Sequence, residues 1–275
     1  MGFLGQMSEE QYKKIQAIRS SELGLILKSP AHYKYWVGKT SPDNDAFRIG
    51  RIIHQAILEP TKFKGSYIVA PEFGDQRSST NRKTKEEWLL AHQDRTVILA
   101  DEIEMIEGMM TSVSKHQYAM GLLENGVTET AGEYIDPKTE LKLKIKPDFM
   151  SNDHSILLDV KTTIDCSRTV FKYAIKKYKY HFQQAMYCEG IKQITGVEVK
   201  YPVIMAIEKK PPYDVAIYVL DQATMEMGKS MYRKALDTLA RCRETNNWTG
   251  YQSNVETIGI PIFSEEMEDY SEISG

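Results

Sequence analysis

Two aspartates and a lysine have the residue types and spacing needed to handle a divalent cation and a phosphate together. Asp148 follows Pro147, and after ten intervening residues the chain reads Asp159-Val160-Lys161. Because side chains alternate along a strand, Asp159 and Lys161 share one face, and a hairpin can bring Asp148 beside them. Mg²⁺ usually takes one or two carboxylates plus water and substrate phosphate. The pattern indicates phosphate-ester chemistry, in which Lys161 stabilises negative charge on the phosphorus oxygens.

A later stretch combines positive charge with aromatic rings. Gln183 and Tyr187 are four residues apart and share a helix face that extends back to Tyr180. Residues 165–181 carry one acid against five lysines or arginines and a histidine, with three tyrosines between them: Arg168, Lys172, Lys176, Lys177, Lys179, His181, Tyr173, Tyr178 and Tyr180. Such a mixture suits the backbone and bases of a nucleic acid. A solvated amphipathic helix is the alternative interpretation.

An earlier helical stretch contains Gly50 and, four residues on, His54. The glycine would let another element approach closely. The histidine lies at the edge of the apolar stripe, where it is either a core residue or, if the helix faces the carboxylates, a metal ligand.

Composition restricts the class of protein. The 275 residues are 41% hydrophobic and 27% charged, as in one large or two small globular domains. The sequence has neither a long apolar run nor a secretory signal, so we expect no membrane contact. The three cysteines form no CxxC pair, which argues against a disulfide framework, a zinc ribbon or a four-cysteine iron–sulfur cluster. We therefore expect a cytoplasmic location.

Two stretches resemble the end of a phosphate-binding loop but lack its first glycine. They are Gly38-Lys39-Thr40 and Gly228-Lys229-Ser230. We expect no nucleotide cofactor.

The elements that must position these residues follow from periodicity and from turn residues. We expect short helices within 8–40, helices at 44–58, 84–93, 100–115, 167–176, 179–194 and 221–244, a loop at 64–83, and strands at 128–135, 140–149, 156–161, 200–208 and 214–220. This order predicts an α/β fold with a mixed central sheet flanked by helices. We expect a single domain over 1–263, with a helical N-terminal part (about 8–125), a sheet-bearing core (about 126–220), a C-terminal helix (about 221–246) and a disordered acidic tail (264–275).

The ordered motifs resemble those of a known superfamily. Gly50…His54, Pro147-Asp148, Asp159-Val160-Lys161 and Gln183…Tyr187 are similar to the motifs of PD-(D/E)xK nucleases in the branch with GxxxH and QxxxY. Within that branch the chain resembles the RecE-type (exonuclease VIII-like) exonucleases of phages and prophages over about residues 20–262. Further matching stretches are GRIIHQAILEP, KIKPD, LDVKTT, YHFQQAMY, EKKPPY and NWTGY.

The resemblance implies a role for each matching residue. His54, Asp148 and Asp159 would ligate Mg²⁺, with Mn²⁺ as a substitute and the Val160 carbonyl as a further ligand. Lys161 would position and activate the attacking water. Gln183 and Tyr187 would orient the lysine, the substrate or a phosphate. Glu129 falls where relatives often carry an acid and is a further candidate ligand.

The chain departs from the family pattern at Lys146, where an arginine is usual, and at Glu140, where a glycine is expected. Neither change touches the metal ligands. A basic stretch over 75–85 also matches the family and would grip a phosphate or a strand, although a solvated loop is an equal alternative. The residues that we expect to contact DNA are Arg77, Arg82, Lys83, Lys85, Lys146, Lys172, Lys176, Lys177, Lys179 and Tyr180.

The resemblance implies a Mg²⁺-dependent 5′→3′ exonuclease that acts on linear duplex DNA and leaves 3′ single strands for recombination by strand annealing. It also implies a ring-shaped homo-oligomer (trimer or tetramer), a RecT-like annealing partner and a phage or prophage gene in a bacterial host. A ring would reconcile DNA binding with the net charge of −3. The alternatives are a structure-specific or restriction-type endonuclease, a DNA-end-binding scaffold that does not cut, and a domain that binds only protein.

Overall fold

The computed structural model describes residues 1–39, 45–252 and 254–259, without the side chains of residues 45, 46 and 101. Its centre is a five-stranded sheet in the order β10 (Val215–Val219), β9 (Tyr201–Glu208), β8 (Ile156–Thr163), β7 (Phe149–Ser151), β4 (Gly126–Thr128). The β8–β9 pair is parallel, whereas the other neighbours are antiparallel. The expected mixed sheet is therefore present. The acidic tail lies outside the described residues.

A second sheet of three strands meets the first at a corner. It contains β1 (Gly2–Gln6), β5 (Thr130–Ile135) and β6 (Lys142–Ile145). The strands expected at 128–135 and 140–149 are each broken in two. One break is at Glu129, whose φ is 50°, and the other is at Pro147, which has no N–H for a strand ladder. The hairpin therefore leaves one sheet and joins the other.

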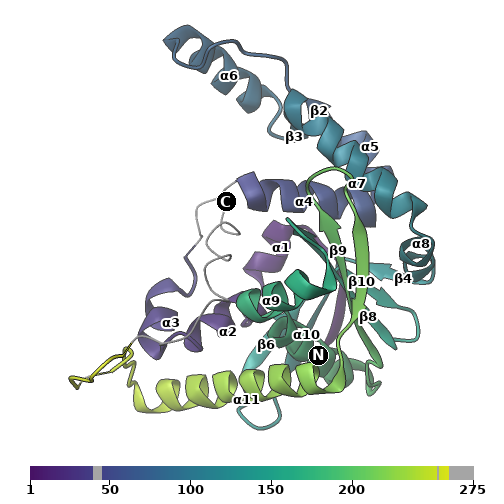
Figure 1. The fold of residues 1–275 in the computed structure, drawn as a ribbon. Helices are drawn as coiled ribbons and strands as arrows, with labels where there is room; N and C mark the ends of the chain where they lie inside the picture. Colours follow the sequence, from purple (N-terminus) through teal and green to yellow (C-terminus); the bar gives the residue numbers. More distant parts are fainter. Residues whose placement is uncertain (40–44, 253, 260–275) are drawn as a thin grey trace.

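Helices cover both faces of the five-stranded sheet (Figure 1). On one face lie α2 (Ser20–Ile26), α3 (Pro30–Trp36), α9 (Arg168–Tyr178), α10 (Tyr180–Thr195) and α11 (Gln222–Thr245). On the other lie α4 (Asp45–Leu58), α7 (Ile103–Lys115), α8 (Gln117–Leu123) and the one-turn η1 (Ala100–Glu102). In β8, Leu157 packs in the core under α10, while Leu158 and Val160 pack in the core under α4. This alternation turns Asp159 and Lys161 toward α10.

Helices α10 and α11 pack closely at Gly228. A Cβ atom added there would lie 2.2 Å from the carbonyl oxygen of His181, so only a glycine fits. This contact accounts for the glycine of the Gly228-Lys229-Ser230 stretch. Lys179, with a φ of 58°, forms the left-handed bend between α9 and α10.

The N-terminal segment covers the polar face of β6. Ser8 caps α1 (Glu9–Lys14) in a capping box with Gln11. Lys144 is buried, and its ammonium group donates to the carbonyl oxygens of Tyr12 and Ile15, each at 2.9 Å, at the end of α1. A lysine is favourable at this end of a helix dipole, and it fixes α1 to the strand.

Residues 60–98 form an arm whose base, with Phe63 and Ile98, packs in the core with α4 and whose outer part projects from the rest of the molecule (Figure 1). The arm contains α5 (Pro60–Ser66), β2 (Tyr67–Val69), α6 (Ser79–Ala91) and β3 (Thr96–Ile98), with β2 and β3 paired in parallel. The prediction of a loop over 64–83 is therefore partly wrong, because β2 and the start of α6 lie within it. Helix α6 begins at Ser79, capped by the Ser78 side chain, rather than near 84. No residue of α6 is buried, so the polar sequence gave no apolar stripe from which to find its start.

Other differences at this level are small. Helix α2 has Arg19 as its N-cap, and the strand β1 was not expected from the sequence. Across the described residues, no helix has the length and apolar character needed to cross a bilayer.

Candidate functional site

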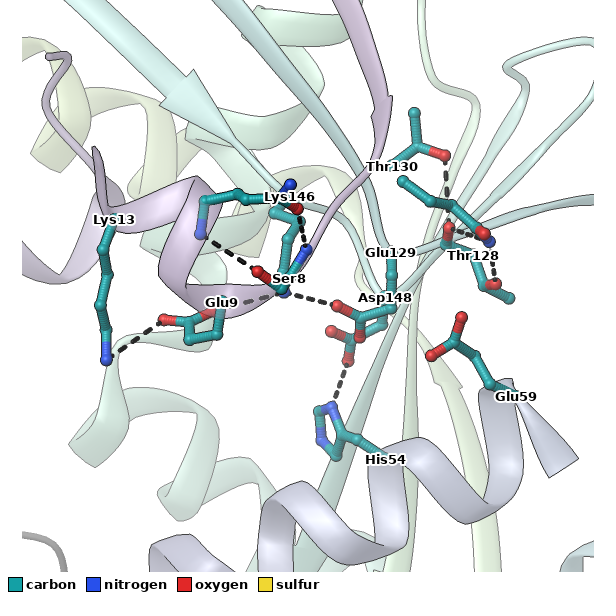
Figure 2. Close-up of polar contacts among 12 residues, drawn as sticks. Ser8, Glu9, Lys13, His54, Glu59, Thr128, Glu129, Thr130, Lys146 and Asp148 are labelled. Atoms are coloured by element: carbon teal, nitrogen blue, oxygen red, sulfur yellow. Dashed lines mark hydrogen bonds and ion pairs between the residues drawn. The ribbon is translucent and has the colours of Figure 1, made fainter. Parts of the chain in front are cut away.

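Three side chains converge at the corner between the two sheets (Figure 2). His54 on α4, Glu129 at the β4–β5 break and Asp148 after Pro147 each offer a ligand atom, and these atoms all lie within 4.8 Å of one another. His54 Nδ1 is 3.4 Å from Asp148 Oδ2. Two carboxylates and an imidazole form a donor set that suits a divalent cation. Helix α4 faces the carboxylates, which is the arrangement in which the sequence makes His54 a candidate metal ligand rather than a core residue.

The corner itself holds two of these ligands in place. The Glu129 N–H donates to the Asp148 carbonyl oxygen at 3.0 Å, which joins the two breaks. The Asp148 carboxylate accepts a hydrogen bond of 2.7 Å from the backbone N–H of Val160 on β8. The break in each strand thus turns an acidic side chain toward the centre, while the backbone stays anchored to the neighbouring strand.

Asp159 lies beside this group but is engaged on the α10 side. Its Oδ1 accepts a hydrogen bond of 3.1 Å from Gln183, and its Oδ2 is 2.6 Å from the ammonium group of Lys161. Among the described residues, the set of three converging ligand atoms therefore includes Glu129 where the sequence pattern placed Asp159. The roles of Asp159 and of the Val160 carbonyl as ligands stay predictions.

Burial and charge push the pKa values of the two aspartates apart. Burial raises the pKa of Asp159 to about 6, against the opposing charge of Lys161. Burial also acts to raise the pKa of Asp148, but His54 and Lys161 outweigh it and bring the value to about 2. Burial lowers the pKa of Lys161, yet both carboxylates outweigh it and the net direction is upward. Lys161 is therefore a cation and hydrogen-bond donor at neutral pH.

Lys146 pairs with one of the three converging side chains. Its ammonium group is 2.7 Å from Glu129 and 3.3 Å from Glu9 on α1, and its side chain is largely buried (Figure 2). The sequence indicated that Lys146 contacts DNA and does not touch the metal ligands, but here it forms ion pairs with two carboxylates, one of which is the candidate ligand Glu129. Glu9 was missed, because nothing in its spacing indicates that α1 folds over this strand.

The sequence profile of a family described as a PDDEXK-like domain of unknown function (DUF3799) matches residues 11–259. The chain belongs to this family. The resemblance to PD-(D/E)xK enzymes, the fold class and the enzyme class, a nuclease, are thereby confirmed, whereas the RecE-type assignment stays a prediction.

Comparison with solved structures supports the fold of this PDDEXK-like protein. A protein from Eubacterium rectale, described as a "putative exonuclease", superposes with a TM-score of 0.63 at 13% identity, covering 94% of this chain and 97% of that one. SSO0001 aligns at 16% identity over 70% and 85% of the two chains, with a TM-score of 0.30. LHK-Exo in complex with dAMP aligns at 12% identity over 87% and 98%, with a TM-score of 0.29. Neither of these two bears on the fold. No curated protein matches the sequence.

The QxxxY pair of this PDDEXK-like protein lies on α10 as the four-residue spacing predicts. Gln183 reaches Asp159, while Tyr187 is buried one turn further along. Burial, together with the charges of Asp159 and Asp148, raises the pKa of Tyr187 to about 12. Its hydroxyl is therefore neutral and adds no charge near the carboxylates.

Helix α9 carries its lysines on the surface next to the site. Lys172, Lys176 and Lys177 are exposed, and within the part of the chain that the structure describes they form no ion pair with an acidic side chain. Tyr180 joins this helix to the centre, because the Lys161 ammonium lies 5.0 Å from its ring centroid. Tyr178 stacks on Tyr180 at 5.6 Å. Cations and rings are thus continuous from α9 to Lys161.

The basic residues of the arm lie elsewhere. Arg77 pairs with Asp75 at 3.3 Å and Lys83 with Glu87 at 3.8 Å. Arg82 is exposed and Lys85 is partly exposed, both on the helix α6 that projects from the body (Figure 1). The structure does not bring these residues to the corner, so their contact with DNA stays a prediction.

Proposed function

We propose that this protein is a Mg²⁺-dependent 5′→3′ exonuclease that degrades one strand of linear duplex DNA and leaves a 3′ single strand. The single observation that carries the proposal is the corner of the sheet. There His54, Glu129 and Asp148 converge, and Asp159 and Lys161 lie directly beside Asp148 on the adjacent strand. The family assignment adds the nuclease fold.

The residues divide the work of phosphodiester hydrolysis. Water attacks phosphorus, the bond from phosphorus to the 3′ oxygen breaks, and that oxygen takes up a proton, so that a 5′ mononucleotide leaves. A divalent cation held by His54, Glu129, Asp148 and Asp159, with the Val160 carbonyl, would lower the pKa of water and neutralise phosphate charge. Mg²⁺ is the proposed ion and Mn²⁺ a substitute, because both accept carboxylate oxygens.

Lys161 would act on the phosphate and the attacking water, and Gln183 would act through Asp159. The ammonium of Lys161 lies 2.6 Å from Asp159, where it can stabilise negative charge on the phosphoryl oxygens and position the attacking water. Gln183 donates to the other oxygen of Asp159 and holds that carboxylate in one orientation. Tyr187, one turn along the same helix, fixes the position of α10 against the core.

The DNA would approach over α9. Its exposed lysines lie next to Tyr178 and Tyr180, which continue to Lys161. Phosphates along this face would be neutralised by Lys172, Lys176, Lys177 and Lys179, and the arm would hold the duplex further from the cut through Arg77, Arg82, Lys83 and Lys85.

The biological setting is part of the same proposal. On the family resemblance, the protein would form a ring-shaped homo-oligomer, a trimer or tetramer, and cations on the inner face of that ring would reconcile DNA binding with the net charge of −3. The 3′ single strand would pass to a RecT-like annealing protein in recombination, within the cytoplasm of a bacterial cell that carries the phage or prophage gene.

Digestion of end-labelled DNA tests the proposal. Linear duplex labelled at either the 5′ or the 3′ end is incubated with Mg²⁺, with circular duplex and the Asp159→Asn variant as controls. We expect early release of labelled mononucleotides from the 5′-labelled end, intact circles and an inactive variant. Cut circles would instead indicate an endonuclease. Salt-sensitive binding without cutting would indicate an end-binding scaffold, and the absence of any DNA binding would indicate a protein-binding domain.

A further inference from the structure

Helix α3 and the segment after α11 form a surface of aromatic rings and lysines that is separate from the metal centre. The backbone N–H of Ala31 donates to the carbonyl oxygen of Thr249 at 3.0 Å, which joins the two pieces. Tyr33 is buried and stacks on Trp248 at 5.9 Å, so the rings beneath the surface are fixed. We refer to Tyr35, Trp36, Tyr251, Lys34 and Lys39 as the aromatic–lysine surface.

The rings of this surface are unusually accessible. Tyr35 is 61% exposed, Trp36 45% and Tyr251 70%. Tyr35 and Trp36 meet edge to face, with centroids 5.0 Å apart and planes at 83°, so that two ring faces with different orientations are offered. Large exposed rings that lie side by side are typical of a binding surface.

Lysine ammonium groups lie over the rings of this surface and over Trp248 beneath it. Lys39 lies 3.4 Å from the Tyr35 centroid and 5.7 Å from that of Trp36, while Lys34 lies 5.0 Å from that of Trp248. Residues 28–39 contain three lysines and no acid, and residues 245–252 contain no acid either. Because a lysine side chain is flexible, its ammonium can turn to a phosphate while a base takes its place over the ring.

We infer that the aromatic–lysine surface binds single-stranded DNA by stacking unpaired bases on Tyr35 and Trp36 and by pairing phosphates with Lys34 and Lys39. Unpaired bases have free faces that a ring can cover, whereas the bases of a duplex already stack on one another. A protein partner would also cover the rings, but the excess of positive charge favours the polyanion. The inference rests on the proposed function in one respect, because that reaction leaves a single strand to be bound.

Fluorescence anisotropy with labelled oligothymidylate, measured in EDTA so that nothing is cut, tests the inference. The Tyr35→Ala/Trp36→Ala variant should bind an oligomer of about 12 nucleotides about 100-fold more weakly than the wild type, or about 10-fold for each ring lost, and a matched duplex almost unchanged. Tyr118→Ala is the matched control, since Tyr118 on α8 is 73% exposed and lies outside this surface.

A conservative change separates stacking from folding. Trp36→Phe keeps a ring and should bind within a few-fold of the wild type, but it should lose most of the tryptophan quenching that single-stranded DNA causes. Unaltered binding by the double alanine variant, or an equal loss in Tyr118→Ala, would overturn the inference. If the wild type cuts linear duplex while the double variant binds normally, the inference alone fails. If the wild type does not cut while the double variant loses binding, the proposed exonuclease fails and the surface stands as a single-strand site.

Discussion

Charged side chains at the corner of the sheet and on the arm are held in different ways. At the corner, Asp148 and Asp159 are buried, and each is bound by a backbone or side-chain donor. On the arm, Arg77 and Lys83 pair with near neighbours in sequence at the surface. A buried charge without its partner is costly, whereas a surface ion pair contributes about 0–1 kcal/mol. The corner therefore has one well-defined arrangement, while the arm owes little of its structure to its charges.

The largest effect should come from the buried carboxylate of Asp159. We expect Asp159→Asn to lower the rate of cutting by about 1000-fold or more, because the variant cannot balance the charge of Lys161 or of a metal ion. Binding of duplex DNA should be retained. Release of labelled mononucleotides measures the first quantity and a filter-binding assay the second. Cutting near the wild-type rate would remove Asp159 from the site.

A change at Lys146 tests whether its ion pair with Glu129 affects metal binding at the corner. Lys146→Ala leaves Glu129 without the cation that holds its carboxylate in place, and we expect the affinity for Mn²⁺ to fall by about 10- to 100-fold, as calorimetry can measure. Lys142→Ala is the matched control, because Lys142 on the same strand pairs with Glu133 at 2.8 Å away from the metal ligands. Equal effects of the two changes would show that the Glu129–Lys146 pair has no special influence on the site.

A comparison of α9 with the arm tests where phosphates are bound. Replacing Lys176, Lys177 and Lys179 by glutamine should weaken duplex binding and reduce the slope of log K against log salt by about 3. The same replacement at Arg82, Lys83 and Lys85 should reduce the slope less, since Lys83 already pairs with Glu87. A larger change for the arm variant would reverse the proposed approach of the DNA.

Truncating a side chain on the arm should have the smallest effect of all, a small change in the free energy of unfolding. Leu90→Ala on α6 removes an exposed side chain and should change the free energy of unfolding by about 0.5 kcal/mol or less. Leu158→Ala, in the core next to Asp159, should cost about 2–5 kcal/mol. Urea denaturation of both variants measures the difference. A comparable loss at Leu90 would indicate that α6 packs against a partner in solution.

The same contrast explains what the sequence could reveal. The alternation along 156–161 indicated that Asp159 and Lys161 share a face, and helical spacing indicated that Gln183 and Tyr187 do, because a core on one side imposes a period. The strand breaks at Glu129 and Pro147 were missed, since they depend on which sheet each half joins. The start of α6 was missed because a helix without a buried face has no period to detect. The short strand β1 was missed because it pairs with β5, more than 120 residues along the chain.

The buried Lys144 links the beginning of the chain to its reactive centre. Lys144 fixes α1 through two carbonyl oxygens, α1 carries Glu9, and Glu9 shares Lys146 with Glu129. Proteolysis or truncation that removes the first fourteen residues would leave every proposed metal ligand in the polypeptide. It would also remove the Tyr12 carbonyl oxygen that the buried Lys144 ammonium donates to, and it would remove Glu9, one of the two carboxylates that pair with Lys146. Shortened forms of this protein should therefore be compared with the full chain before any loss of activity is attributed to a ligand.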